Sequence, residues 1–430
     1  MTHGLAGLLI ADVAEQSLTR RGLSVGTRLR RALSVLGIVA AEFPDSDLIY
    51  SGRVLNMGSL GYLLHHRGHT HTIVWAVVSA VLLWLVARWW VQRTSEPLTR
   101  SASTTLLVVA LVGTLSHLLL DFTNSYGVHP FWPFDGRWYY GDAVFIVEPW
   151  LWLVAIPPLW WNRPRGIGRW LLPFLLLVIV AATVLLGQVA RDVSVVLVVF
   201  ALLWSVGQRL LSATGRTVSG VAAWVLVTVG FFVASSKAEA RVREAVVASA
   251  AAGERVYDVS LNPGPGDWGC WSAVVVTGTD TTYRVTTAVV APFSGVRSVA
   301  ICRTAYQDGR LGTDVLGDLP EHAVVPFVAT TQVVWRSTWR ASRLALAALY
   351  ATCEGYAALH FMRVPLLLRT GAGCHWMTPV LASGAGSAIW RSRSQGAHGS
   401  GTGSQGGCRR GGMCWRERKE SANRQKRTDN

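Results

Sequence analysis

Residues between Gly61 and Thr72 combine side chains that can bind a metal ion. The segment reads Gly-Tyr-Leu-Leu-His-His-Arg-Gly-His-Thr-His-Thr and holds four histidines within seven residues: His65, His66, His69 and His71. Imidazole nitrogen is a common ligand for zinc and similar divalent ions, and ionisable groups at membrane level are costly unless they have a role. The alternative interpretation is a solvated basic loop, or a metal-binding tract without a physiological role.

Two further segments carry carboxylates and another histidine. Asp45 and Asp47 lie in a Pro-Asp-Ser-Asp sequence, which suits oxygen ligation or a simple polar turn. His117 and Asp121 are spaced i, i+4, so on a helix they project from one face about 5–6 Å apart. Such a pair can share a divalent ion, the carboxylate can orient a metal-bound imidazole, or the two can form a helix-terminal hydrogen bond.

The composition indicates which elements must position these groups. Of the 430 residues, 51% are apolar and only 15% charged, and there are 20 tryptophans, which collect at membrane interfaces. About six stretches approach the roughly 20 apolar residues that span a bilayer. They are residues 71–88, 104–120, 143–161, 170–190, 193–208 and 218–235. The first 30 residues lack the charge order of a secretory signal peptide, and 4–18 and 28–43 predict two shorter, half-buried helices.

The predicted fold is mainly α, a polytopic transmembrane helix bundle with a small C-terminal β domain and a disordered basic tail. Its parts are the bundle (1–235), a connecting amphipathic helix (236–253), a soluble β-rich domain with a trailing helix (254–365), and a Gly/Ser/Arg-rich tail (366–430), disordered or translated out of frame. Strands are expected at 256–261, 271–277, 282–290 and 296–302, a loop at 262–267 and a hairpin turn at 278–280.

The net charge of +15 does not indicate a nucleic-acid partner. Residues 390–430 hold ten Lys and Arg against three acids, and much of the remaining excess is arginine in short loops. No helix or aromatic-interleaved basic patch is directed at a phosphate backbone. Cys270 and Cys302 would pair in an extracytoplasmic domain, although two isolated cysteines are more often thiols.

Tracing the spans brings the candidate ligands to one side of the membrane. That side gathers His3, Glu42, Asp45, Asp47, His65, His66, His71, His117 and Asp121. The other side, here called the arginine end, gathers Arg20, Arg21, Arg28, Arg30, Arg31, Arg88, Arg93, Arg100, Arg163, Arg165, Arg169, Arg209 and Arg216. Because basic loops stay cytoplasmic, the candidate site and the β domain are expected to face outward.

Taken in order, these motifs resemble a family of membrane-bound metal-dependent hydrolases, described as LexA-regulated, YdjM-like inner-membrane proteins of bacteria. The resemblance covers roughly residues 1–365, and the tail after about residue 365 departs from it. The matching pieces are Thr2-His3, Pro44-Asp45-Ser46-Asp47, His66-Arg67-Gly68-His69-Thr70-His71-Thr72, His117-Leu118-Leu119-Leu120-Asp121, Thr123-Asn124-Ser125-Tyr126-Gly127, Trp132-Pro133-Phe134, Gly141-Asp142 and Ile146-Val147-Glu148-Pro149-Trp150.

The resemblance implies a multi-pass protein of the bacterial inner membrane with a metal site, and it implies a hydrolase less firmly. Because the site would open at headgroup level, a small-molecule or lipid substrate such as a phosphoester is expected. One or two divalent ions, zinc by preference, would be held by His3, Asp45, His66, His71, His117 and Asp121. Asp47 or Glu42 would accept the water's proton, and Arg67 would steady an anionic leaving group. Supporting residues would be His65, His69, Asn124, Asp142 and Glu148.

The alternative function is a non-catalytic membrane protein whose metal site is structural or transports an ion. Transporters usually contain internal repeats and broken helices near the bilayer midplane. The sequence contains no such repeat, and the polar cluster lies at helix ends. These features favour the hydrolase without excluding the structural site.

Overall fold

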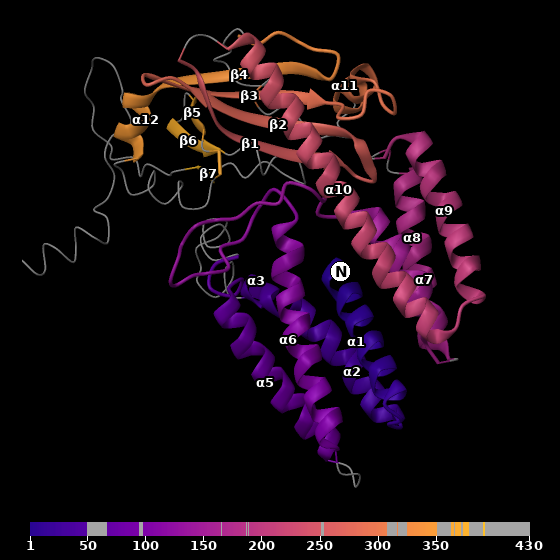
Figure 1. Ribbon diagram of the computed structural model, residues 1–430. Coiled ribbons are helices and arrows are strands. Elements are labelled where there is room, and N and C mark those ends of the chain that lie inside the picture. The colour runs from indigo at the N-terminus through magenta and orange to yellow at the C-terminus, as the bar shows by residue number, and fades with distance from the viewer. Residues whose placement is uncertain are drawn as a thin grey trace, which may run out of the picture.

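The computed structural model describes residues 1–49, 67–93, 98–164, 166–185, 187, 189–250, 253–307, 316, 325–350, 363–364, 366–370, 373–377 and 390–391. Two parts are evident, a helical bundle and an antiparallel sheet at one end of it (Figure 1). The predicted His65 and His66 lie outside the described residues. So does most of the predicted tail, of which three short strands are described, β5 (Leu366–Thr370), β6 (Gly373–Met377) and β7 (Trp390–Arg391).

The first half of the bundle packs four helices around a shared apolar core. They are α1 (Thr2–Arg20), α2 (Thr27–Glu42), α5 (Ile73–Gln92) and α6 (Arg100–Phe122). The short η1 (Phe43–Ser46) and α3 (Asp47–Ile49) follow α2. Side-chain caps set where the two longest begin, because the Thr72 hydroxyl accepts a hydrogen bond from Trp75 N and the Thr99 hydroxyl accepts one from Ala102 N.

Glycines allow the first helices to approach closely. A Cβ on Gly7 would overlap the carbonyl group of Gly37, and a Cβ on Gly37 would overlap that of Gly7. Across the α2–α6 contact, a Cβ on Gly113 would lie 2.8 Å from the Ala40 Cβ. The helices α2 and α6 run parallel to each other and antiparallel to α1. The start of α1 therefore lies at the same level as the ends of α2 and α6.

The second half of the bundle consists of α7 (Pro149–Asn162), η3 (Ile167–Trp170), α8 (Leu171–Leu185), α9 (Arg191–Arg209) and α10 (Ala213–Ser249). Among the described residues, four helices are long and apolar enough to cross a membrane, namely α5, α6, α9 and α10, and α8 is a shorter apolar helix. The chain is therefore a membrane protein, but the predicted count of about six spans is not confirmed. The predicted span 143–161 is shortened because Glu148 caps α7 and Pro149 is its first residue.

The helix α10 joins the bundle to the sheet. Its 37 residues correspond to about 55 Å, well beyond the roughly 30 Å hydrocarbon core of a bilayer. The predicted span 218–235 and the predicted connecting helix are thus one continuous helix, whose end crosses the sheet (Figure 1). Its small and apolar face, including Ala238 and Val242, packs on Leu261, Ala273 and Val275.

The sheet has the order β1-β2-β3-β4 and is antiparallel throughout. Its strands are β1 (Arg255–Gly264), β2 (Asp267–Gly278), β3 (Thr282–Val290) and β4 (Val333–Ser342), and α12 (Arg343–Tyr350) follows. The hairpin turn predicted at 278–280 is confirmed. The loop predicted at 262–267 is wrong, since Pro263 continues the edge strand β1 and only residues 265–266 form the turn.

The strand predicted at 296–302 is also wrong, because this region begins α11 (Val299–Gln307). This helix packs on β2 and β3, where Cys302 forms a disulfide with Cys270. The pairing was left open by the sequence. It follows from the fold, which brings together two cysteines 32 residues apart.

Candidate metal centre

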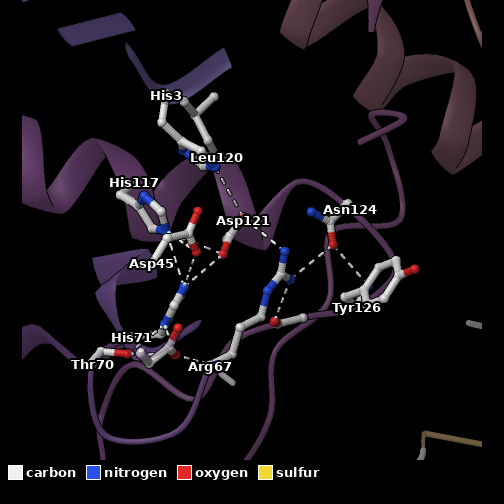
Figure 2. A network of polar contacts seen from close by, with 12 residues as sticks. His3, Asp45, Arg67, Thr70, His71, His117, Leu120, Asp121, Asn124 and Tyr126 are labelled. Atoms are coloured by element: carbon white, nitrogen blue, oxygen red, sulfur yellow. Dashed lines mark hydrogen bonds and ion pairs between the residues drawn. The ribbon is translucent and has the colours of Figure 1, made fainter. Parts of the chain in front are cut away.

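Four segments that are distant in sequence deliver polar side chains to one point at the bundle's end. Asp45 comes from η1, His71 from the loop that precedes α5, and His117 and Asp121 from the last turns of α6. Figure 2 shows these four groups directed toward one another, with His3 from the start of α1 beside them. The i, i+4 pair predicted on α6 therefore does share a face and joins the other two segments.

The separations between the four ligand atoms fit a metal ion. The Nε2 atoms of His71 and His117 are 3.1 Å apart, and each lies 3.5 Å from Asp45 Oδ1. Asp121 Oδ2 lies 3.1 Å from the first and 3.6 Å from the second. A tetrahedral site with bonds of about 2.0–2.1 Å has edges of about 3.3 Å between its ligand atoms. These five distances bracket that value, and all four atoms lie within 4.8 Å of one another.

Hydrogen bonds to the far sides of both rings fix their tautomers. His117 Nδ1 lies 2.6 Å from the carbonyl oxygen of Ala41, which can only accept, so this nitrogen carries the proton. His71 Nδ1 lies 3.0 Å from Thr70 Oγ1, whose own proton is donated to Asp47 Oδ2 at 2.8 Å. In the neutral rings, both Nε2 atoms therefore present lone pairs to each other. This contact is repulsive unless a cation, or an added proton, lies between them.

The carboxylates support the same interpretation. Asp121 Oδ2 is buried and has no hydrogen-bond donor among the described residues, although it faces both imidazoles. An orphaned buried carboxylate oxygen is unusual and fits a site for a cation. The donor set of two imidazoles and two carboxylates is one that zinc accepts.

Asp47 lies behind His71, on the side away from the Nε2 atoms. Its Oδ2 accepts hydrogen bonds from Thr70 Oγ1 and from the backbone N–H of Arg67, and it lies 3.5 Å from His71 Nδ1. The side chain is fully buried and does not line the adjacent cavity. This geometry suits a residue that orients a metal-binding imidazole rather than the proton acceptor expected from the sequence.

Arg67 holds the second oxygen of Asp121. One of its terminal nitrogens donates to Asp121 Oδ1 at 2.9 Å, and the other donates to Asn124 Oδ1 and to the carbonyl of Gly127. Its backbone is left-handed, with φ of 58°, which is uncommon for a residue other than glycine and often marks a functional site. Because a guanidinium occupies Asp121 Oδ1, the described residues support one ion rather than two.

His3 and a cavity lie on the open side of the cluster. The His3 ring stacks on that of His117 at 3.9 Å between centroids, and its Nε2 lies 3.5 Å from Asp121 Oδ1. A cavity of about 360 Å³ adjoins these groups, and its wall includes His3, Asp45, Arg67 and Asp121 together with apolar residues 144–147. The side chain of Asp45 is 29% exposed, so water can reach the cluster from this side.

The other predicted residues serve elsewhere. Glu42 accepts a hydrogen bond from Gly4 N and pairs with the amino group of Met1, so it fixes the start of α1 instead of facing the cavity. His69 is exposed and packs against Trp132. Asp142 pairs with Arg363, and Glu148 is buried where α7 meets the β1–β2 turn, so both connect the bundle to the β domain.

Some contributors could not be recognised from the sequence. The Ala41 carbonyl has no side-chain signal, and Thr70 is an ordinary residue of the histidine-rich segment. His129 is isolated in sequence, but its Nε2 donates to the Gly68 carbonyl at 2.8 Å and its ring stacks on Trp138. It therefore anchors the loop that carries Arg67 and His71.

Comparison with known proteins agrees with these motifs. Residues 1–193, which contain all four clustered ligands, match the YdjM inner membrane protein family. This part of the chain is therefore similar to the members of that family. The chain is also 29% identical over 170 residues to "Inner membrane protein YbcI" of Escherichia coli (strain K12), an alignment that covers 33% of this chain and 91% of that protein. No solved structure matches. The resemblance to YdjM-like inner-membrane proteins predicted from the motifs is thus confirmed for residues 1–193, and the protein is one of the inner membrane.

Proposed function

We propose that the cluster of Asp45, His71, His117 and Asp121 binds one divalent ion, zinc by preference, and that the protein is a metal-dependent hydrolase. The observation that carries the proposal is the set of four ligand atoms within 4.8 Å of one another, five of whose six separations are 3.1–3.6 Å, beside a cavity that water can enter. An ion held there would supply a Lewis acid and acidify a bound water.

The chain's own residues would then bind the substrate and move its protons. Of the groups that line the cavity, His3 is the one placed to exchange a proton with the substrate, since Glu42 and Asp47 are engaged elsewhere. Arg67 keeps Asp121 in position, and its Nε has no hydrogen-bond partner among the described residues. Because this Nε is buried, an anionic group of the substrate would have to contact the part of the Arg67 side chain that lines the cavity, the role predicted for the leaving group.

The cavity favours a substrate with both polar and apolar parts. One wall carries ionisable groups, and the other consists of residues 144–147, of which Ile146 and Val147 are exposed. A phosphoester or a lipid-derived substrate has this character. The cluster lies at the ends of α5 and α6, where headgroups are located rather than acyl chains.

We further propose that this end of the protein faces away from the cytoplasm. The arginine end carries guanidinium–tryptophan contacts of the kind expected at an interface, including Arg28 on Trp90 and Arg93 on Trp89. The Cys270–Cys302 disulfide supports the same orientation for the β domain, because such bonds persist in oxidising compartments.

A second function, a purely structural metal site, is favoured by one observation. Four protein ligands complete a tetrahedron, whereas catalytic zinc sites usually keep one position open. The two functions differ in what they require of the partly exposed Asp45. In a hydrolase this ligand must leave room for water at the metal, whereas in a structural site it need not.

The experiment compares metal content and hydrolysis in detergent-purified protein. The wild-type protein should hold one equivalent of zinc, and His71→Ala and His117→Ala should lose it. His69→Ala is the matched control, because this exposed histidine lies in the same loop outside the cluster. Full metal content in the first two variants would contradict the proposed site.

Activity is then measured on a panel of phosphodiesters and phospholipids. A hydrolase should be inhibited by chelators, and His3→Gln should keep its metal but lose about 10²–10⁴-fold in turnover, the usual contribution of a proton-transferring group. Stoichiometric metal without hydrolysis of any member of the panel, in protein that unfolds when metal is removed, would favour the structural site instead.

A further inference from the structure

A second hollow lies along the membrane-facing side of the bundle, between α1, α6 and α10. Figure 1 shows α1 between the other two helices. The groove has a volume of about 820 Å³, within the range of about 300–1,000 Å³ that is typical of ligand sites. Its α6 wall runs from Arg100 to Leu120, which corresponds to about 30 Å, the thickness of the hydrocarbon core.

The groove is apolar along its middle and basic at the arginine end. Its middle is lined by apolar residues, among them Val13, Val108, Val112 and Trp224. At the arginine end, it is lined by two guanidinium groups, those of Arg21 and Arg100, and by hydroxyl groups of Ser17, Ser101 and Thr104. No acidic side chain lines the groove within the described residues.

Both arginines are available to a ligand. Arg21 and Arg100 are exposed, and within the described ranges neither forms an ion pair or a cation–π contact. By contrast, nearby Arg30 pairs with Glu15 and Arg163 pairs with Asp12. A basic pocket between transmembrane helices at headgroup level attracts anionic lipid headgroups.

We propose that this groove is a binding site for an anionic phospholipid of the leaflet at the arginine end. Arg21 and Arg100 would hold its phosphate, and an acyl chain would lie against Val13, Val108 and Trp224. The combination of two unpaired guanidiniums with an apolar hollow commits the occupant to a charged lipid, since neither a neutral lipid nor a soluble anion uses both features. The proposed headgroup site is separate from the metal centre, which lies at the opposite end of α1 and α6, although Leu120 lines both the groove and the cavity beside the metal cluster.

The test is a titration of detergent-purified protein with dioleoyl phosphatidylglycerol and dioleoyl phosphatidylcholine, followed by native mass spectrometry. The wild-type protein should bind phosphatidylglycerol more tightly. The Arg21→Gln/Arg100→Gln protein should lose on the order of 30-fold in that affinity, because each basic residue near the surface contributes about fivefold. Binding of phosphatidylcholine should change little.

Two controls separate this site from general surface effects. Arg20→Gln/Arg31→Gln removes the same charge from exposed arginines at the same end that do not line the groove, and it should keep the preference. Val108→Trp should fill the groove and weaken both lipids, whereas Val86→Trp, on the exposed face of α5, should not.

The proposal is overturned if both arginine pairs have equal effects, if Val108→Trp leaves binding unchanged, or if inorganic phosphate displaces the lipid at equal concentration. Because none of these variants touches the metal ligands, metal content should remain that of the wild-type protein. Failure of the lipid site and failure of the hydrolase proposal can therefore be distinguished.

Discussion

Glu148 makes the stability of the junction between the bundle and the β domain depend on pH. Its side chain is fully buried, and its two oxygens accept hydrogen bonds from the backbone N–H groups of Trp150 and Gly266. Burial raises the pKa of Glu148 from 4.5 to about 8, the two hydrogen bonds oppose the rise, and the charge of Asp267 adds to it. The carboxyl therefore binds a proton more tightly in the folded protein than in the unfolded one.

The sign of the effect follows from this difference. The folded state is favoured most below pH 4.5, loses stability as the pH rises from 4.5 to about 8, and changes no further above it. At about 1.4 kcal/mol per pKa unit, the difference between about 8 and 4.5 amounts to at most about 5 kcal/mol. Asp142, whose pKa burial raises to about 6 against the effect of Arg363, contributes in the same direction at lower pH.

Replacing Glu148 by glutamine separates the contribution of Glu148 to the pH dependence of stability from that of Asp142. The amide is neutral at every pH, but it accepts only one of the two backbone hydrogen bonds and turns its NH₂ group toward the other donor. At pH 5, the variant should therefore be less stable than the wild-type protein by about 1–3 kcal/mol, the cost of an unsatisfied buried donor. At pH 8, where the wild-type carboxyl is ionising, the deficit should vanish or reverse.

The stability difference between the variant and the wild-type protein can be measured by tryptophan fluorescence during denaturant or thermal unfolding in detergent, at pH values from 4.5 to 8.5. Trp150 and Trp268 lie near the junction and provide a local signal. Glu239→Gln removes an exposed carboxylate of α10 and should leave the pH dependence unchanged. If Glu148→Gln follows the wild-type curve at all pH values, the side chain does not titrate in this range and the reasoning is refuted.

Three further predictions concern the site and its supports. Asp47→Asn should lower zinc affinity about 10–100-fold in a chelator competition while all four ligands remain, since it disturbs the orientation of His71, and unchanged affinity would contradict that role. Gly37→Val should destabilise the protein by about 1–3 kcal/mol, because the new side chain would clash with the Gly7 carbonyl. Gly26→Ala, with open space around it, should not destabilise the protein. Equal unfolding midpoints for the two variants would argue against the close crossing of α1 and α2. Replacing Cys270 and Cys302 by serine should cost the β domain about 3–4 kcal/mol in non-reducing denaturant titrations, from the length of the closed loop, and no difference would indicate that the pair is reduced.

The convergence of the metal ligands was predictable because membrane spans constrain direction. Each span returns the chain to the opposite side, so the side on which His71, His117 and Asp121 lie follows from counting alone. The i, i+4 spacing of the last two then fixes their common face. These arguments use only helix geometry and bilayer thickness.

The roles within the cluster could not be read in this way. Asp45 and Asp47 are two residues apart and chemically identical, yet one faces the Nε2 atoms and the other the Nδ1 side of His71. This choice depends on the turn at η1 and on Thr70, which are tertiary details. Likewise, the segment 296–302 is too short for its periodicity to distinguish a strand from a helix. In the structure, residues from Val299 onward form a helix that packs on the sheet.

The β domain contacts the wall of a site whose ligands it does not supply. All four clustered ligands lie in the family-matched residues 1–193, whereas the sheet begins at Arg255. The loop between α6 and α7 connects them, since it supplies part of the cavity wall and is tied to the β domain through Asp142 and Glu148. The sheet and this part of the cavity wall are therefore connected through the loop between α6 and α7.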